Sequence, residues 1–422
     1  MKKQSIFAQL QDRGFVYQGT NIQDIQDILD NHRIVFYLGV DPTAQSLHIG
    51  HLVTLMMFKR LQDFGHQGIL LLGGATGLVG DPSGKQELRQ MMTNDTVVLN
   101  IDSIQKSAER FIATSNDNQA IIANNADWFR DINFVDFMRN IGVHFNVNKM
   151  LAAEAYLNRL DNGGLTFLEM SYMLMQGYDF VQLNQIHNCT LQIGGSDQWG
   201  NIVAGTRLYR KIKFGNDEHC DTQDKLQNIY GLTCPLLLTK SGKKMGKTEK
   251  GTLWLDPTKT TPYEFYQYFY NVDDQDVSKL LKMFSNIDTR EIEHLVSTDI
   301  IQAKKTMAYE LTTLVHGKSI ADQCVTTSVS LFGSNVLDIS NAPTIQLELQ
   351  QLQNGINITQ LCVLSKSTDS TTQARRLIES GAISLNNTKV TDTKYTVTNI
   401  DLIDNSILLK KGKKHFVKIV FV

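Results

Sequence analysis

The sequence has few cysteines, and their positions exclude two common ways of stabilising a chain. No two of the five cysteines form a C-x-x-C pair; they are Cys189, Cys220, Cys234, Cys324 and Cys362. Zinc ribbons need paired ligands, and disulfide frameworks need an oxidising compartment and usually a short chain, so both classes are excluded. The pattern fits a reducing cytosol, and we expect a cytoplasmic protein without a protein-bound structural metal.

Long apolar runs are also missing. No run approaches the roughly 18 apolar residues that a membrane-spanning helix needs. Residues 1–4, Met-Lys-Lys-Gln, lack the hydrophobic core of a signal peptide, and Asp12 comes too early for a transit peptide. We therefore expect no membrane partner.

The chain also lacks an excess of charge of one sign. The formal net charge of the 422 residues is -2, with 20% charged and 42% hydrophobic residues. Such a composition is typical of a globular protein, and the length predicts about two to three domains. Because the whole chain is not basic, any nucleic-acid surface must be confined to one region.

The segment 34–61 carries the strongest local pattern. Residues 34–38, Ile-Val-Phe-Tyr-Leu, form an apolar run that predicts a buried strand. A Gly-Val-Asp-Pro-Thr break follows, and then a Leu-, Met- and Phe-rich run predicts a helix. Ser46 can cap this helix, whose first turn then holds His48 and His51 on one face.

A helix that starts with two histidines indicates phosphate binding. The free N–H groups and the partial positive charge of a helix N-terminus favour anions, and imidazoles add donors. Gly50 has no side chain, so a flat ring can approach the backbone there. One histidine at this place is usually a tolerated polar residue, whereas two at this spacing favour a triphosphate site. The His-x-Gly-His pattern alone names no enzyme, because nucleotidyltransferases share it.

Two more glycine-rich loops follow apolar strands. Residues 68–72 lead into the loop 73–85, which matches neither the Walker spacing nor the dinucleotide-binding spacing. Its glycines suggest that a ligand approaches the backbone, and Asp81 offers a carboxylate. Residues 190–193 lead into a third such loop, 194–201. Strands that alternate with helices predict an α/β protein with a Rossmann-like, doubly wound parallel sheet, on which these loops converge.

A polar stripe lies on an otherwise apolar helix predicted around residues 165–179. Tyr172, Gln176 and Asp179 stand at i, i+4 and i+7, and methionines and leucines surround them. A solvated face is the simple alternative. The apolar surroundings favour a stripe that lines a pocket.

The lysine-rich segment 236–248 contains two glycines and predicts a mobile basic loop. A solvated hairpin tip would explain such a loop in isolation. Here it accompanies a triphosphate site that still lacks cations for the leaving group, so we expect the loop to serve that site.

The end of the chain differs in charge from the rest. Residues 366–422 hold ten lysines and arginines against five aspartates and glutamates. A solubilising tail is the simple alternative, but residues 373–386 have their own apolar pattern of helix, glycine and strand. The asymmetry indicates an RNA contact.

Taken together, these stretches resemble the bacterial tyrosyl-tRNA synthetases, a family of class I aminoacyl-tRNA synthetases, over nearly the whole chain. The resemblance rests on Tyr37 together with residues 41–43, and on the Tyr172, Gln176 and Asp179 stripe. It also rests on four further segments, which are residues 48–51, 80–85, 194–201 and 244–248. The tail resembles a small RNA-binding domain shared with a ribosomal protein.

The resemblance implies a two-step reaction. Tyrosine would attack ATP to give tyrosyl-adenylate and pyrophosphate, and the tyrosyl group would pass to the 3′-terminal ribose of tRNA(Tyr). Such chemistry needs positioning and charge stabilisation more than a protein nucleophile. ATP would bring Mg²⁺ held mainly by phosphate oxygens.

The resemblance also implies roles for single residues. The catalytic set would be Thr43, His48, His51, Lys244, Lys247 and Thr248. The tyrosine-binding set would be Tyr37, Asp81, Asn125, Tyr172, Gln176, Asp179 and Gln198. The ATP-binding set would be Asp41, His48, Gly50, His51, Gln192, Gly195, Asp197 and Lys247. The tRNA-binding set would be Arg375, Arg376, Lys410, Lys411, Lys413 and Lys414.

The expected domain plan has four parts. They are a Rossmann-like catalytic domain (1–228), a lysine loop with an α-helical domain on the anticodon side (229–332), a linker (333–351) and a small basic α+β RNA-binding domain (352–422). A symmetric homodimer is expected through the region 130–170, which is rich in phenylalanine and methionine.

Two alternatives remain open at this point. A tryptophanyl enzyme would share the fold, but it would have no use for a Tyr37 and Asp179 pair facing a phenol. An RNA-binding scaffold with an inactive catalytic domain is disfavoured by the intact histidines and lysines of the two signature segments.

Overall fold

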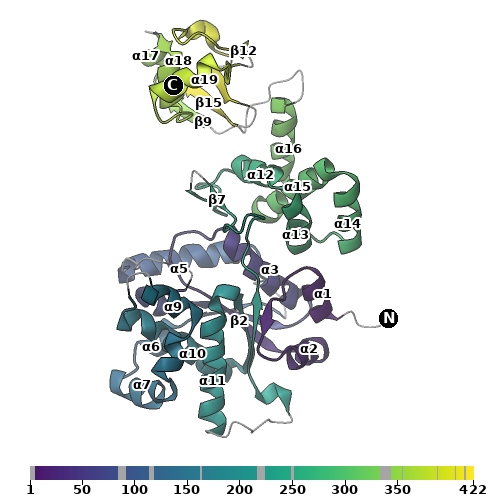
Figure 1. The fold of residues 1–422 in the computed structure, drawn as a ribbon, viewed down its shortest axis with the longest axis vertical. Coiled ribbons are helices and arrows are strands. Elements are labelled where there is room, and N and C mark those ends of the chain that lie inside the picture. Colours follow the sequence, from purple (N-terminus) through teal and green to yellow (C-terminus); the bar gives the residue numbers. More distant parts are fainter. Residues whose placement is uncertain are drawn as a thin grey trace. The chain divides into compact units, whose positions relative to one another are not determined.

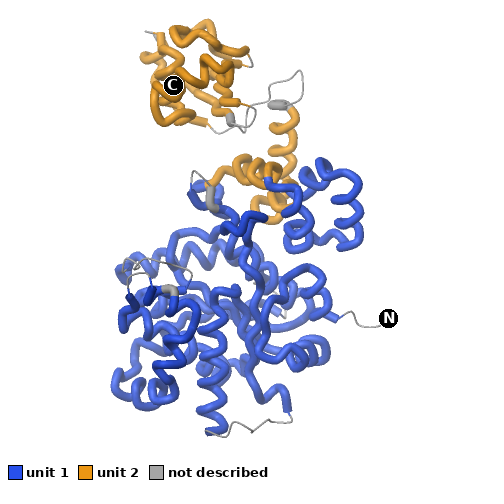
Figure 2. Tube along the Cα trace, in the orientation of Figure 1, with its two compact units in different colours: residues 1–259, 272–307 blue, residues 260–271, 308–422 orange. Residues whose placement is uncertain are grey.

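The computed structural model describes most of the chain. The described residues are 5–83, 92–113, 118–161, 164–215, 224–248, 251–332, 344–353, 355–386, 388–403, 405–412 and 415–422. The chain forms two compact units, residues 1–259 with 272–307 and residues 260–271 with 308–422 (Figure 2).

The first unit is built on a six-stranded sheet with the order β1-β6-β5-β2-β3-β4 (Figure 1). Its strands are β1 (Gln18–Gly19), β2 (Val35–Val40), β3 (Gln67–Leu72), β4 (Ile121–Asn124), β5 (Cys189–Gly195) and β6 (Tyr230–Cys234). The five strands from β6 to β4 run parallel, and β1 adds an antiparallel edge. The predicted α/β class with a doubly wound parallel sheet is confirmed. The sheet includes β6, which lies after the expected domain boundary at residue 228.

Helices surround this sheet and supply most of the remaining structure of the first unit. Those before β5 are α1 (Ile6–Asp12), α2 (Ile22–Asn31), α3 (Ile49–Asp63), α4 (Thr76–Val79), α5 (Asn94–Ala108), α6 (Ala126–Phe129), α7 (Phe134–Asn140), η1 (Gly142–His144), α8 (Val147–Leu151), α9 (Glu154–Asp161) and α10 (Phe167–His187). Those after it are η2 (Ser196–Gln198), α11 (Trp199–Phe214), η3 (Lys225–Gln227), α13 (Asp274–Phe284) and α14 (Thr289–Thr298). A small hairpin joins β7 (Lys247–Thr248) to β8 (Gly251–Thr252).

The helix α3 follows β2 as the sequence predicts, but Ser46 does not cap it. The N-cap is His48, whose Nδ1 accepts the backbone N–H of Gly50 at 3.1 Å. The Ser46 hydroxyl is buried and donates to the Leu47 carbonyl at 2.9 Å instead. The expectation was wrong because an imidazole nitrogen can fill the capping role that small oxygen-bearing side chains usually take.

The helix α10 is long, and both of its ends are closed by local contacts. Thr166 and Glu169 form a reciprocal capping box at its start, and Asn188 ends it with φ at 54°. Tyr172 and Asp179 lie on its buried face. The helix packs along α11 in the first unit (Figure 1).

The second unit contains helices and a separate small sheet. Its helices are α12 (Pro262–Tyr270), α16 (Lys318–Phe332), α17 (Leu349–Gln353), α18 (Ile358–Leu364), α19 (Thr371–Glu379) and η4 (Asn399–Asp401), and α15 (Ile300–His316) spans the division between the units. Its strands are β9 (Thr344–Leu347), β10 (Ile356–Asn357), β11 (Ile383–Leu385), β12 (Thr388–Lys389), β13 (Thr396–Val397), β14 (Ser406–Lys411) and β15 (His415–Phe421).

The five-stranded sheet of the second unit has the order β12-β11-β14-β15-β9. Helices α18 and α19 contribute Ile358, Leu361 and Ile378 to the core beneath it. Residues 344–347 were expected in the linker, but they form β9 and pair with β15. In the described part of the chain no helix is long and apolar enough to cross a membrane.

Candidate active site

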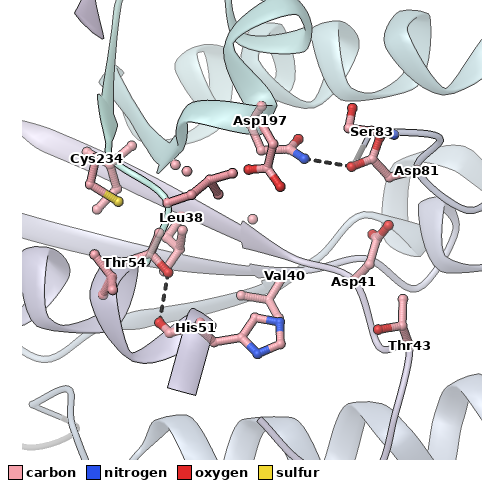
Figure 3. Close-up of a pocket in the computed structure, with 18 of the residues that line it drawn as sticks. Leu38, Val40, Asp41, Thr43, His51, Thr54, Asp81, Ser83, Asp197 and Cys234 are labelled. Carbon is pink, nitrogen blue, oxygen red and sulfur yellow. Dashed lines mark hydrogen bonds between the residues drawn. The ribbon is translucent and has the colours of Figure 1, made fainter. Parts of the chain in front are cut away.

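A cavity of about 440 Å³ opens in the first unit at the carboxyl ends of β2, β3 and β5, beside the start of α3 (Figure 3). The three glycine loops that the sequence predicts to converge all contribute to its wall, through Gly39, Gly73 and Gly194. This is the position where parallel α/β sheets usually bind ligands.

Most of the predicted site residues of the first unit line this one cavity. They are Tyr37, Asp41, Thr43, His48, Gly50, His51, Asp81, Asn125, Tyr172, Gln176, Asp179, Gln192, Gly195, Asp197, Gln198 and Lys244. The structure therefore brings together residues that lie up to about two hundred positions apart in the chain. Their individual roles remain predictions.

The most enclosed part of the wall combines Tyr37 with Asp179. Asn125 Nδ2 and Trp128 Nε1 donate to the Asp179 carboxylate at 3.1 and 2.9 Å. Burial raises the pKa of Asp179 to about 8 in spite of these donors. Burial, and next the charge of Asp179, raise the pKa of Tyr37 well above its ordinary value. The Tyr37 hydroxyl has no hydrogen-bond partner among the described residues.

Sequence reasoning missed Trp128, although a signal was present. The segment 124–128 predicts a turn, and the turn pattern alone gives Trp128 no role. A buried indole N–H needs an acceptor, and the buried carboxylate of Asp179 is a strong one.

A hydrogen-bond chain links the loop after β2 to α10. The Tyr172 hydroxyl donates to one oxygen of Asp41 at 2.8 Å, and the Thr76 hydroxyl donates to the other at 2.8 Å. Asn125 Nδ2 donates to the Thr76 hydroxyl at 2.9 Å. Asp41 is predicted to bind ATP, and here its carboxylate also fixes Tyr172. The sequence gives no sign of this role for Thr76, because the residue stands among the glycines of the loop after β3.

Further carboxylate and amide side chains line the cavity. Gln198 Nε2 donates to Asp81 Oδ2 at 2.6 Å, and the backbone N–H of Ser83 donates to Asp81 Oδ1 at 2.9 Å (Figure 3). The Oε1 atoms of Gln176 and Gln192 are buried without a hydrogen-bond partner in the described chain. The cavity wall is therefore rich in acceptors and suits a ligand that brings N–H or O–H donors.

The two histidines of α3 stack on one another with their ring centroids 3.9 Å apart. His51 Nδ1 accepts the backbone N–H of His48 at 3.1 Å. Burial, and then the neighbouring His48, lower the pKa of His51 to about 3. Because each Nδ1 accepts a backbone N–H, each neutral ring carries its proton on Nε2. The Thr54 hydroxyl donates to the His51 carbonyl at 2.9 Å (Figure 3).

The segment that follows the lysine loop is anchored at the start of α3. The segment 253–255 pairs with residues 47–49: Ile49 N donates to the Leu253 carbonyl at 3.2 Å, and Leu255 N donates to the Leu47 carbonyl at 2.9 Å. Lys244 lines the cavity, and its charge opposes the burial that raises the pKa of Asp197. The backbone of Lys247 and Thr248 forms β7, whose partner residue Thr252 lines the cavity, but their side chains lie outside the described part of the structure.

The predicted tRNA-binding residues belong to the second unit. Arg375 and Arg376 are exposed on α19, and Lys410 and Lys411 lie on β14. Lys411 Nζ donates to the Ser367 carbonyl at 2.9 Å. Lys413 and Lys414 lie outside the described residues. Within the described part of the chain, no cluster of three His, Cys, Asp or Glu side chains could hold a metal ion.

Comparisons with known proteins cover both halves of the chain. Residues 29–333 match the family of class I tRNA synthetases for tryptophan and tyrosine, and residues 338–419 match the tyrosine–tRNA ligase SYY-like C-terminal domain. A tyrosine–tRNA ligase of Clostridium beijerinckii is 44% identical over 98% of this chain and 99% of its own length. The chain belongs to the tyrosine–tRNA ligase family. One from Clostridium perfringens is 43% identical over 99% of both chains.

Solved structures agree with this family assignment. A C-terminally truncated mitochondrial tyrosyl-tRNA synthetase of Aspergillus nidulans is 30% identical, with a TM-score of 0.68, and the match covers 78% of this chain and 95% of that one. A tryptophanyl-tRNA synthetase of Encephalitozoon cuniculi, at 13% identity and a TM-score of 0.53 over 76% of this chain and 89% of that one, shows the shared fold alone. The full-length relatives favour tyrosine over the tryptophanyl alternative, and the enzyme over the inactive scaffold.

Proposed function

We propose that this member of the tyrosine–tRNA ligase family activates L-tyrosine in the cavity described above. The tyrosine carboxylate attacks the α-phosphorus of ATP, which releases pyrophosphate and leaves tyrosyl-adenylate. A hydroxyl of the 3′-terminal ribose of tRNA(Tyr) then takes the tyrosyl group, and AMP leaves. The chain supplies orientation and charge stabilisation for both steps.

The amino acid occupies the Tyr37 side of the cavity. Its phenol hydroxyl meets Tyr37 and Asp179, since Asp179 is already oriented by Asn125 and Trp128. Its ammonium group meets Asp81, Tyr172 and Gln176, which all line the cavity.

ATP occupies the side nearer α3. Gly50 leaves space for the adenine, and His51, Gln192, Gly195 and Asp197 line the ribose side, while Gln198 lies toward the tyrosine carboxylate. Thr43, His48, Lys244, Lys247 and Thr248 act on the β- and γ-phosphates, where charge develops as pyrophosphate leaves. Mg²⁺ arrives as part of the substrate, bound to phosphate oxygens.

The observation that best supports this proposal is the buried, unpartnered Tyr37 hydroxyl next to Asp179. A phenol would satisfy both groups, whereas an indole or a phenyl ring would leave at least one of them unpaired. The test is tyrosine-dependent exchange of labelled pyrophosphate into ATP, with phenylalanine and tryptophan as competitors. A pyrophosphate-exchange rate that is higher with tryptophan than with tyrosine would overturn the proposal.

We further propose that the C-terminal sheet domain binds tRNA through Arg375, Arg376, Lys410, Lys411, Lys413 and Lys414. Exposed arginines on one helix support a phosphate contact. The four cysteines in the described chain are buried free thiols, which supports a reducing compartment such as the cytoplasm.

A homodimer is proposed through the surface formed by α7, η1, α8, α9 and the start of α10. Apolar side chains of these elements are exposed: Phe134, Val135, Val143, Val147, Leu157, Leu160, Phe167 and Leu168. Phe137 and Phe145, two of the phenylalanines in the region 130–170, instead pack against the core. The proposal therefore rests on Phe134 and Phe167 and their exposed neighbours.

A further inference from the structure

A buried ion pair lies outside the cavity, at the start of α10. Arg159 of α9 donates through Nε to Glu169 Oε1 at 3.1 Å, and its Nη2 lies 3.0 Å from the same oxygen. The two side chains are only 2% and 7% exposed. Neither lines the cavity. An ion pair buried this deeply is costly to desolvate, so its presence calls for a role beyond stability.

Glu169 also closes the first turn of α10. Its Oε2 accepts the backbone N–H and the hydroxyl of Thr166, both at 3.0 Å, while the Thr166 hydroxyl accepts the Glu169 N–H at 3.2 Å. The helix N-terminus is thereby joined to α9 through one carboxylate. The Tyr156 hydroxyl adds a second tie, since it donates to the Met170 carbonyl at 2.9 Å.

This turn has little other support on its outer side. Within one chain, Phe167 and Leu168 are 58% and 41% exposed and do not anchor the turn, although both belong to the surface proposed for the dimer. Tyr172 and Gln176 follow Glu169 at i+3 and i+7, on the same face of the helix. A shift of the first turn would therefore reach these two side chains, of which Tyr172 is also held by Asp41 through its hydroxyl.

We propose that Arg159 and Glu169 are positioning residues for tyrosine binding, because their pair fixes the α10 turn that places Tyr172 and Gln176. The inference rests on the proposed function, in which these two side chains meet the substrate ammonium. Asp179 lies further along α10 and is held separately by Asn125 and Trp128. The pair thus sets the ammonium end of the site and leaves the phenol end in place.

Glu169→Gln breaks the ion pair and also perturbs the cap, because the carboxylate uses Oε1 for Arg159 and Oε2 for Thr166, whereas a glutamine has one acceptor oxygen. Its NH₂ group has to face either the Arg159 guanidinium or the Thr166 donors. Pyrophosphate exchange with the full-length variant should show a KM for tyrosine raised about tenfold, with the KM for ATP changed less than about twofold. The inhibition constant of 3-(4-hydroxyphenyl)propionate, which lacks the amino group, should change less than about twofold.

The chain offers a matched control in the second unit. Thr261 and Glu264 form the same capping box at the start of α12, with Thr261 N donating to Glu264 Oε2 at 3.2 Å. Glu264→Gln makes the same chemical change far along the chain from the motifs of the cavity. It should leave both KM values within about twofold of wild type.

Variants of Arg159, the other member of the ion pair, give a second and independent test. Arg159→Met leaves a buried carboxylate unpaired, and the combination of Arg159→Met with Glu169→Gln removes that charge. The double variant should therefore have a lower KM for tyrosine than Arg159→Met alone. This partial rescue is not expected from two unrelated losses of stability.

Several outcomes would overturn the inference. They are an equal rise of the KM values for tyrosine and ATP, an unchanged KM for tyrosine with only a lower melting temperature, or an equal loss of binding for the analogue without an amino group. A wild-type enzyme without tyrosine-dependent exchange would instead refute the proposed function, so the two failures are distinguishable.

Discussion

The hydroxyl of Tyr37 is buried beside the carboxylate of Asp179, yet it has no hydrogen-bond partner among the described residues. Asp179 is held from its other side by Asn125 and Trp128. A buried polar group without a partner costs about 1–3 kcal/mol. The pair is thus prepared for a ligand that carries a hydroxyl at this position.

Tyr37→Phe should weaken the preference for tyrosine over phenylalanine by about tenfold, because one of the two groups that reject phenylalanine is removed. The ratio of kcat/KM for the two amino acids measures this. Tyr209→Phe is the control, since Tyr209 is also buried but donates to the Gln227 carbonyl outside the cavity. An unchanged ratio in Tyr37→Phe would refute the placement of the phenol.

Lys247→Ala should slow adenylate formation by about a hundredfold or more and leave the affinity for tyrosine almost unchanged. The reason is that the lysine would meet charge that develops only as pyrophosphate leaves. Single-turnover adenylate formation and tyrosine titration separate the two effects. Lys240→Ala in the same loop is the control, and a comparable loss of tyrosine affinity in Lys247→Ala would contradict the assignment.

Asp179 should make the folded state less stable as the pH rises. Its pKa is raised to about 8 by burial, whereas the unfolded chain has the ordinary value of 3.8. The folded state thus binds the proton more tightly, and this contribution to stability is complete below pH 4 and lost as the pH rises through 8.

Asp179→Asn should accordingly flatten the fall of unfolding free energy between pH 4 and pH 8, by at most about 1.4 kcal/mol per pH unit. Urea unfolding across this range measures the difference between the variant and the wild type. Asp63→Asn, at an exposed site on α3, should leave the profile unchanged. Parallel profiles for Asp179→Asn and the wild type would contradict the raised pKa.

Phe134→Glu should weaken the proposed dimer. Phe134 is 67% exposed, and a charge placed there would have to be desolvated on association. Light scattering over a dilution series should show the monomer at concentrations where the wild type is dimeric. Ile186→Glu, at a 56% exposed site near the other end of α10, is the control. A wild type that is monomeric at micromolar concentration would refute the interface.

A chain that ends near Pro343 should still exchange pyrophosphate but should charge tRNA poorly. The cavity residues all precede residue 260, whereas the proposed tRNA contacts follow residue 370. In the full chain, Arg375→Ala with Arg376→Ala should reduce tRNA affinity and its salt dependence, since each lost phosphate contact removes about 0.7–0.9 from the log-log slope. Full aminoacylation by the truncated chain would show that the tail does not bind tRNA.

The sequence predicted the sheet and the cavity because both follow from local patterns. Apolar runs that end in glycine loops give β2, β3 and β5, and the carboxyl ends of parallel strands meet at one edge. The same patterns could not predict the hydrogen bonds of Trp128 and Arg159, because their partners Asp179 and Glu169 lie 51 and 10 residues away in the chain. They also assigned the cap of α3 to Ser46, since propensity alone does not reveal that two imidazoles bond to the backbone.

The caps on α3 have a consequence for how the enzyme meets ATP. His48 and His51 use their Nδ1 atoms to hold the helix together, and His51 has a pKa of about 3. Adding a proton to either Nδ1 would break the backbone contact that orients the ring. His51 therefore stays neutral at physiological pH and can offer a hydrogen-bond donor but no charge. In the proposed function, the positive charge at the triphosphate comes from Mg²⁺ and the lysine loop. If Lys244 and Lys247 act as proposed, neutralising the charge of the leaving pyrophosphate then falls to these two lysines and the metal ion, and not to the buried His51 ring.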